Sequence, residues 1–243
     1  MNAARHAVAL AGLLSCARSP GDAGAGSGST PAEIRQTLRA GAGRVVPLLK
    51  PQAVIAAIDL GAIGPKRVVA MRRPWRKEVV PGLYAVLAVR EPGQPDRLWT
   101  EHQIASSTVP PEAWLTRAVS NLERRLGATP RRELRDAEGR LSVVELGAAG
   151  DRAATSSAAA AENTSALLLS ERLRTHWLDR FGVEELGVAV PSRDAVVLFR
   201  ADDALARKPV RARVRVPDSP KALPVFRGLL SITRNGLGIL EPP

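Results

Sequence analysis

Short apolar runs separated by turn residues predict strands in the second half of the chain. Residues 186–190 and 195–200 are two such runs, and only the stretch Pro-Ser-Arg-Asp at 191–194 separates them. Runs this close together predict an antiparallel hairpin. A second hairpin is predicted between residues 229 and 240, because the Asn-Gly pair inside that range is the strongest short hairpin signal.

The same kind of pattern predicts strands elsewhere in the chain. Residues 45–51 are apolar but contain two prolines, so they predict an extended segment leading into the domain. Further strands are predicted at residues 66–71, 83–90, 97–103, 141–146 and 210–216.

Two longer stretches carry apolar residues at the spacing of an amphipathic helix. The first begins at residues 110–111, which are both proline, contains Leu115 and Leu122, and is stopped by Gly127. Proline is tolerated there because its missing N–H has no partner in the first turn of a helix. The second, capped by Thr164 or Ser165 and ended by Gly182, has the apolar stripe Leu169, Leu173, Trp177 and Phe181. Shorter helices are predicted at residues 31–38 and 52–60.

The order of these elements predicts the fold class. Strands come first, then a helix, a strand, a helix and several more strands, without a sustained strand–helix alternation. This order favours an α+β fold, in which two main amphipathic helices pack on a largely antiparallel sheet.

The N-terminal residues resemble an export signal. The apolar run at 7–14 is too short to span a bilayer but fits the core of a secretory signal. The sequence Leu-Leu-Ser-Cys that ends at Cys16 resembles the lipobox of bacterial lipoproteins, in which the cysteine is lipidated. Residues 1–16 are therefore predicted to be a signal peptide with a lipobox cysteine. Two alternatives are secretion without lipidation and a cytoplasmic protein whose N-terminal segment is merely rich in alanine.

Low-complexity segments predict the domain boundaries. Residues 17–43 have the Gly, Ser, Ala and Pro composition of a flexible tether that takes no part in the fold. Residues 44–243 are predicted to form one domain, with a low-complexity insertion near 147–163.

The positive charge of the chain suggests nucleic-acid binding, but the distribution of the basic residues does not support it. The net charge is +11, but the basic residues are spread along the chain and 30 of the 35 are Arg. The chain has no zinc-finger pattern, basic leucine-zipper region or aromatic RNA-binding strand. Nucleic-acid binding is therefore disfavoured, and a cationic surface that meets acidic lipid or polymer is the simpler interpretation.

Candidate chemistry is sparse. Ser192, Asp194 and His176 are the residue types of a hydrolytic triad, but no Gly-x-Ser-x-Gly elbow surrounds the serine. The adjacent acids at 184–185 and 202–203 are interpreted as solvated charges unless folding brings the two pairs together. One cysteine and three scattered histidines give no metal-ligand spacing, so no metal or cofactor is predicted.

Five stretches of the chain carry a resemblance to the YtpQ-like bacterial proteins, domain-of-unknown-function family 1444. They are residues 45–51, 83–90, 118–122, 165–169 and 190–194. The resemblance covers roughly residues 44–240. It implies a fold but no established activity.

Two functional hypotheses result. The first is an envelope lipoprotein whose non-catalytic domain binds a ligand or partner and whose membrane attachment is Cys16. The alternative is a cytoplasmic YtpQ-like protein, an enzyme or regulator of unknown substrate. Under either hypothesis, Ser192, Arg193 and Asp194 are first a turn and second a candidate site for an anion or a partner, because a turn does not require an arginine.

Overall fold

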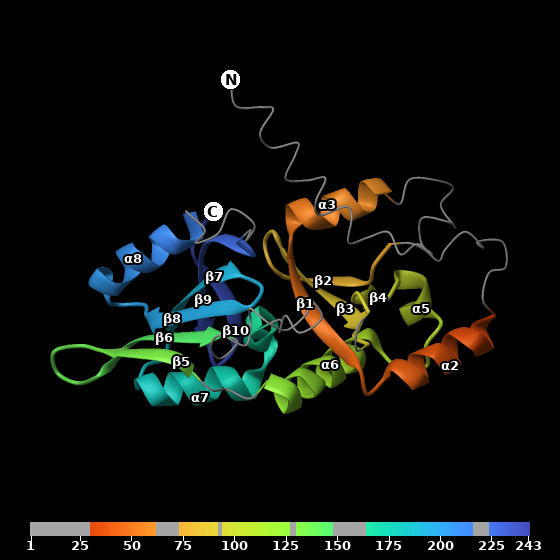
Figure 1. Cartoon of the computed structure of the whole chain (residues 1–243), viewed down its shortest axis with the longest axis horizontal. Helices are drawn as coiled ribbons and strands as arrows, with labels where there is room; N and C mark the ends of the chain where they lie inside the picture. Colours follow the sequence, from red (N-terminus) through yellow and green to blue (C-terminus); the bar gives the residue numbers. More distant parts are fainter. Residues whose placement is uncertain (1–29, 62–72, 92–93, 127–129, 148–163, 216–223) are drawn as a thin grey trace, which may run out of the picture.

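The computed structural model describes residues 30–61, 73–91, 94–126, 130–147, 164–215 and 224–243 (Figure 1). Two sheets make up the fold. The smaller has the strand order β1-β3-β2, with β4 also paired to β3, and the larger has the order β10-β9-β7-β8-β6-β5. Every pairing between these strands is antiparallel, which confirms the predicted α+β class with antiparallel sheets.

The elements of the first sheet and its helices are α2 (Pro31–Gly41), β1 (Val45–Pro51), α3 (Gln52–Gly61), β2 (Arg76–Val80), β3 (Leu83–Val89), β4 (Arg97–Leu98), α5 (Glu101–Ala105) and α6 (Pro111–Leu126). The elements of the second are β5 (Pro130–Arg135), β6 (Leu141–Gly147), the 3-10 helix η4 (Thr164–Leu169), α7 (Glu171–Phe181), β7 (Leu186–Ser192), β8 (Ala195–Arg200), α8 (Ala204–Arg215), β9 (Phe226–Thr233) and β10 (Gly236–Glu241).

Helices cover both faces of each sheet. Figure 1 shows α3 and α8 along one side of the molecule and α2, α6 and α7 along the other. On the second sheet, α8 buries Ala206, Val210 and Val214 against one face, while α7 buries Trp177 and Phe181 against the opposite face. Each helix therefore contributes one apolar stripe to a separate layer of the core.

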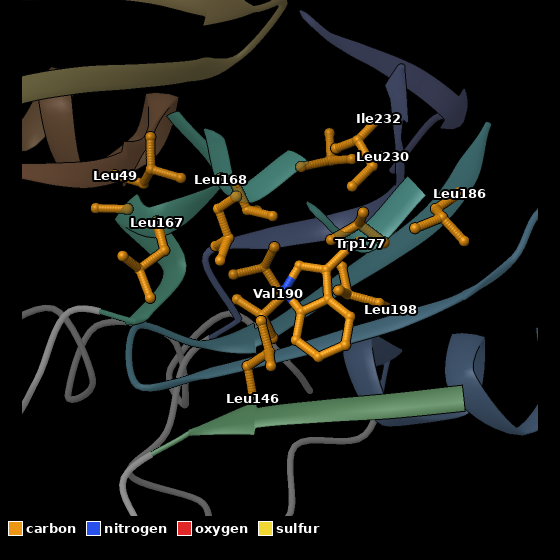
Figure 2. Close-up of a cluster of buried hydrophobic side chains, with 14 of the residues drawn as sticks. Leu49, Leu146, Leu167, Leu168, Trp177, Leu186, Val190, Leu198, Leu230 and Ile232 are labelled. Atoms are coloured by element: carbon orange, nitrogen blue, oxygen red, sulfur yellow. The ribbon is translucent and has the colours of Figure 1, made fainter. Parts of the chain in front are cut away.

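The two sheets share one hydrophobic cluster. Figure 2 shows Leu49 of β1 beside Leu167 and Leu168 of η4, and the same cluster includes Leu122 of α6 and Trp177 of α7. Burying a large aliphatic or aromatic side chain stabilises the fold by about 1.5–3 kcal/mol. The shared cluster therefore ties the two sheets together.

Polar contacts reinforce this junction. The buried side chain of Asn121 on α6 donates to the carbonyl oxygens of Ala42 and Val45, both at 2.9 Å. The Ser170 hydroxyl, which caps α7, donates to the carboxylate of Glu123 on α6. Side chains of α6 therefore hold both the start of β1 and the start of α7.

The predicted strand at 210–216 is wrong, because residues 210–215 lie in helix α8 and residue 216 is outside the described residues. Ala206, Val210 and Val214 recur every four residues and face the sheet, and the carboxylate of Asp203 accepts from the Ala206 N–H at 2.9 Å. The alternation of Arg and Val at 210–216 imitates a strand, but an N-cap and a four-residue apolar repeat favour a helix.

The predicted tether at 17–43 extends too far. Residues 31–41 form α2, which Thr30 caps and which buries Ile34 and Leu38 against the first sheet. The short helix predicted at 31–38 is confirmed. Its apolar face belongs to the fold because Ile34 and Leu38 lose most of their contact with water only when α2 docks. Thr30 and Ala42 cap this helix, and residues 17–29 of the predicted tether lie outside the described residues.

Other boundaries also differ from the predictions. The helix predicted to start at Thr164 or Ser165 is interrupted, because residues 164–169 form a 3-10 helix and Ser170 caps α7. The predicted strand at 97–103 is only two residues long, since Thr100 and Gln103 form a capping box that starts α5. The predicted strand at 66–71 and most of the predicted insertion at 147–163 lie outside the described residues.

Residues 45–51 form a paired strand even though two of them are proline. Among the described residues β1 pairs only with β3, so its other edge carries no described ladder bonds that the prolines would remove. Strands β2 and β5 were not predicted, because their sequences are too charged for an apolar strand pattern.

Candidate functional site

The segment at 192–194 is the turn of the β7–β8 hairpin, as predicted. Ser192 pairs with Ala195 across the hairpin. The Asp194 N–H donates to the Ser192 hydroxyl at 3.3 Å, and Arg193 Nε donates to Asp194 Oδ2 at 3.2 Å. The Ser192 bond is a short side-chain-to-backbone contact of the kind that stabilises turns.

Neighbouring elements fix the position of this turn. The carbonyl oxygen of Arg193 accepts a hydrogen bond at 2.9 Å from the N–H of Ser165, the second residue of η4. A side-chain carbon at Gly147, the last residue of β6, would lie 3.2 Å from the Asp194 carbonyl oxygen. The turn is therefore held from two sides, and its conformation does not depend on its own residues alone.

Asp194 carries the most unusual electrostatics of the turn. Burial raises the pKa of its carboxyl above the ordinary value of 3.8, and the charges of Arg193 and Arg90 oppose this rise only in part. Its Oδ1 atom is buried and has no hydrogen-bond partner among the described residues. A carboxylate with an unsatisfied buried oxygen destabilises the fold, and such groups concentrate at functional sites.

Groups from two other segments, one following β3 and one in η4, lie close to the turn. Arg90, at the end of β3, is held by Asp96 through two bonds of 3.0 and 3.1 Å and is only 10% exposed. The hydroxyl of Ser165 is also buried without a partner. Within the described residues, Arg193 bonds only through Nε. Its terminal nitrogens can therefore bind an anionic group beside the Asp194 acceptor.

The structure does not assemble the triad of Ser192, Asp194 and His176. His176 lies on the exposed side of α7 with its ring against that of Trp177, at a centroid distance of 5.0 Å. It makes no hydrogen bond to Ser192 or Asp194 in the described structure. The Ser192 hydroxyl accepts from a backbone N–H, and no general base within the described residues activates it.

Folding brings three of the four residues of the acidic pairs to one hollow. A shallow depression of about 490 Å³ is lined by Glu184, Glu185 and Asp202, together with Arg207. Arginines partly neutralise these acids: Arg200 bonds Asp202 at 3.0 Å and lowers its pKa, and Arg234 lies 3.9 Å from Glu184. Within the described residues, no group of three or more His, Cys, Asp or Glu side chains could hold a metal ion.

Sequence reasoning missed Arg90, Asp96 and Ser165 as members of the site. The only signal was the resemblance, because the stretches that carry it meet at the junction of the two sheets. β1 pairs with β3, whose following residue is Arg90, and η4 donates to the turn at 192–194. None of these residues has a local pattern that distinguishes it from an ordinary surface residue.

The predicted lipidation residue, Cys16, lies outside the described residues. No helix in the described part of the chain is both long enough and apolar enough to cross a membrane. Comparison with known proteins gives no match to any family model, curated protein or solved structure.

Proposed function

We propose that this chain is a lipid-anchored protein of a bacterial envelope, with a non-catalytic domain that binds a ligand or partner at the β7–β8 turn. The anchor would be Cys16, the only cysteine of the chain, which follows an apolar run and a small residue. Two or more acyl chains hold a protein stably on a membrane.

The observation that carries the binding site is the unsatisfied Oδ1 of Asp194. This oxygen is buried without a partner while its carboxyl is desolvated, so the free domain bears an energetic cost at this point. A bound group that donates an N–H or O–H to Oδ1 would remove that cost. The terminal nitrogens of Arg193 would at the same time bind a negatively charged group.

The chemistry of the site therefore favours a ligand or peptide segment with both a hydrogen-bond donor and an anionic group. The turn supplies one carboxylate and one guanidinium, which lie on neighbouring residues and face each other at 3.2 Å. A zwitterionic or mixed-charge group would satisfy both, whereas a simple cation or a simple anion would satisfy only one of them.

Membrane fractionation tests the anchor. The wild-type protein should remain in the membrane fraction after a wash with high salt, which removes proteins held only by charge. Cys16→Ser should move to the soluble fraction or accumulate as an unprocessed precursor. Wild-type protein found only in the cytosol would contradict the anchor.

Site-specific photo-crosslinking in cells tests the binding site. A photoreactive residue at position 195, which follows the turn and leaves Arg193 and Asp194 in place, should form a discrete adduct that Asp194→Asn removes. The matched control places the same residue at 235, in the turn of the β9–β10 hairpin of the same sheet. Equal adducts from both positions, or adducts that persist in Asp194→Asn, would contradict binding at the β7–β8 turn.

The alternative is a cytoplasmic protein of the YtpQ-like type. The observation that favours it is the meeting of the resembling stretches at the sheet junction, as described above. The fractionation experiment separates the two proposals, because the alternative requires the wild-type chain to be soluble without any change at Cys16.

A further inference from the structure

Helix α8 differs in charge from the other helices of the fold. Its sequence ALARKPVRARVR contains five basic residues and no acidic residue. Helix α7, on the opposite face of the same sheet, contains three arginines and two acids, and α6 contains the same numbers. The surplus of positive charge is therefore concentrated on one side of the second sheet.

Only part of this charge is neutralised inside the protein. Arg211 pairs with Glu241 at 2.9 Å, and Arg213 pairs with Glu145 at 2.5 Å. Arg207 shares Glu241 at 3.8 Å, while the exposed Lys208 makes no ion pair or hydrogen bond with another described residue. Arg207, Arg211 and Arg213 therefore have carboxylate partners, whereas Lys208 has none among the described residues.

Strands β5 and β9 continue the same surface. Leu134 is paired across the sheet with Val143, which packs under α8, and Arg132 is paired with Glu145. Side chains directly opposite in antiparallel strands share a face, so Arg132 and Leu134 lie on the α8 side. Arg227 lies two residues before Leu229, another residue packed under α8, and is exposed.

Apolar side chains are exposed among these cations. Leu205, in the first turn of α8, is 89% exposed, and Leu134 is 39% exposed. The acids nearest Leu205 are engaged: Asp202 pairs with Arg200, and Asp203 accepts a hydrogen bond from the Ser142 hydroxyl at 2.9 Å. A leucine this exposed has an unfavourable contact with water that insertion between lipid headgroups would remove.

We propose that the α8 face, defined by Leu205, Lys208 and Arg211 of α8 with Arg132, Leu134 and Arg227 of the sheet, binds an anionic membrane surface. A basic helix with exposed apolar residues lies in the interface, where its cations meet acidic headgroups and its leucine enters the acyl boundary. The leucines favour lipid over nucleic acid, whose phosphates would use the cations alone.

This inference extends the proposed membrane attachment but does not require lipidation. If Cys16 is lipidated, 14 residues separate it from α2, and a chain of that length reaches at most about 50 Å. The anchor would then keep the domain within reach of the headgroups, and the α8 face would decide which side of the domain rests on them.

Vesicle sedimentation with the full-length, unlipidated Cys16→Ser protein tests this inference apart from the anchor. The protein should sediment with vesicles made of equal parts phosphatidylcholine and phosphatidylglycerol and remain free with phosphatidylcholine alone. Raising the salt from about 0.1 to about 1 M shortens the Debye length from ~10 to ~3 Å and should release it.

Two variants and one matched control locate the contact. Each unit of charge near an anionic surface contributes about 1 kcal/mol, so Lys208→Glu should weaken the partition by about tenfold or more. Leu205→Ser should weaken it by about fivefold, because the apolar insertion is lost. Arg172→Glu makes the same charge change on the exposed side of α7 and should have little effect.

Three outcomes would overturn the inference. The first is that the Cys16→Ser parent protein fails to bind the mixed vesicles. The second is that Lys208→Glu and Arg172→Glu weaken vesicle binding equally. The third is that Lys208→Glu weakens binding to a single-stranded RNA oligonucleotide but leaves vesicle binding unchanged. Far-ultraviolet circular dichroism and melting curves establish that each variant is folded. Because Cys16 is absent from the experiment, none of these outcomes bears on lipidation.

Discussion

The β7–β8 and β9–β10 hairpins belong to the same sheet but are constrained at different ends. The β7–β8 hairpin is constrained at its turn, where η4 donates to the Arg193 carbonyl and Gly147 approaches Asp194. The turn of β9–β10 is contacted through Arg234, which lies 2.5 Å from Asp179 and 3.9 Å from Glu184, and all three side chains are exposed. Its constraint lies at the open end, where the backbone of Glu241 and Pro242 crosses Gly228.

This difference has a consequence for function. A turn that is formed by its own residues and faces water needs no buried charge, and Asn235-Gly236 is sufficient to form it. The turn at 192–194 retains a desolvated carboxylate although its backbone is already held by η4. Because the carboxylate of Asp194 is not needed to build the turn, its burial is better explained by binding.

The largest expected effect of a single substitution on the two hairpins is at Gly228. A methyl group there would collide with the backbone carbonyl of Glu241 and with Pro242, neither of which can rotate away as a side chain could. Gly228→Ala should therefore destabilise the fold by about 3 kcal/mol, the upper end of overpacking costs. Urea unfolding measures this, with Gly43→Ala as the control, since nothing lies within 4 Å of that position. Equal stability of the two variants would show that the end of β10 moves freely.

Lengthening each turn sharpens the comparison. Two glycines inserted after Arg193 should cost about 2 kcal/mol, because the Ser165 N–H would lose its acceptor in a buried position. The same insertion after Asn235 should cost about 0.6 kcal/mol or less, the entropy of a modestly longer loop. Chemical denaturation of both variants gives the two values. If the insertions cost the same, the contact between η4 and the turn contributes nothing.

The pH dependence of stability tests the burial of Asp194. Its pKa is raised in the folded state, so the folded chain holds a proton at pH values where the unfolded chain, at about 3.8, has lost it. This group therefore favours folding below pH 3.8, and that contribution is lost as the pH rises through the folded pKa. Asp194→Asn should remove this pH dependence and be equally or more stable than wild type at pH 7. The free energy of unfolding of Asp194→Asn, minus that of wild type, should be larger at pH 7 than at pH 4. The opposite trend would contradict a desolvated carboxylate.

The smallest expected effects come from the two turn arginines. Arg193 pairs with Asp194 at 3.2 Å and Arg234 pairs with Asp179, and all four side chains are at least one-third exposed. Exposed ion pairs contribute about 0–1 kcal/mol, so Arg193→Ala and Arg234→Ala should both leave the melting temperature nearly unchanged. Only Arg193→Ala should abolish complementation of a deletion strain. If it unfolds the protein instead, Arg193 is a structural anchor and not a binding residue.

Local patterns in the sequence determined the elements that local physics controls. Asn235-Gly236 and the four residues at 191–194 each specified a hairpin, because turn formation depends on neighbouring residues. The apolar stripe Leu173, Trp177 and Phe181 identified the buried face of α7, and Gly182 ended it with a φ of 65°. The antiparallel α+β class followed from the order of these elements.

Tertiary structure decided where local patterns were ambiguous. The segment 210–216 has the alternation of a strand, yet residues 210–215 are helical because Val210 and Val214 bury against the sheet only at a four-residue spacing. Residues 31–41 have a cap and a weak apolar face, and the first sheet is what makes Ile34 and Leu38 part of the core. Asp96 joins the candidate site through its bonds to Arg90. The membership of Arg90 and Ser165 in the site depended on contacts between segments well separated along the chain, because Ser165 donates to Arg193 and the charge of Arg90 acts on Asp194. Such contacts form only when both sheets pack on one cluster, so no pattern along the chain could have placed an unsatisfied carboxylate at Asp194.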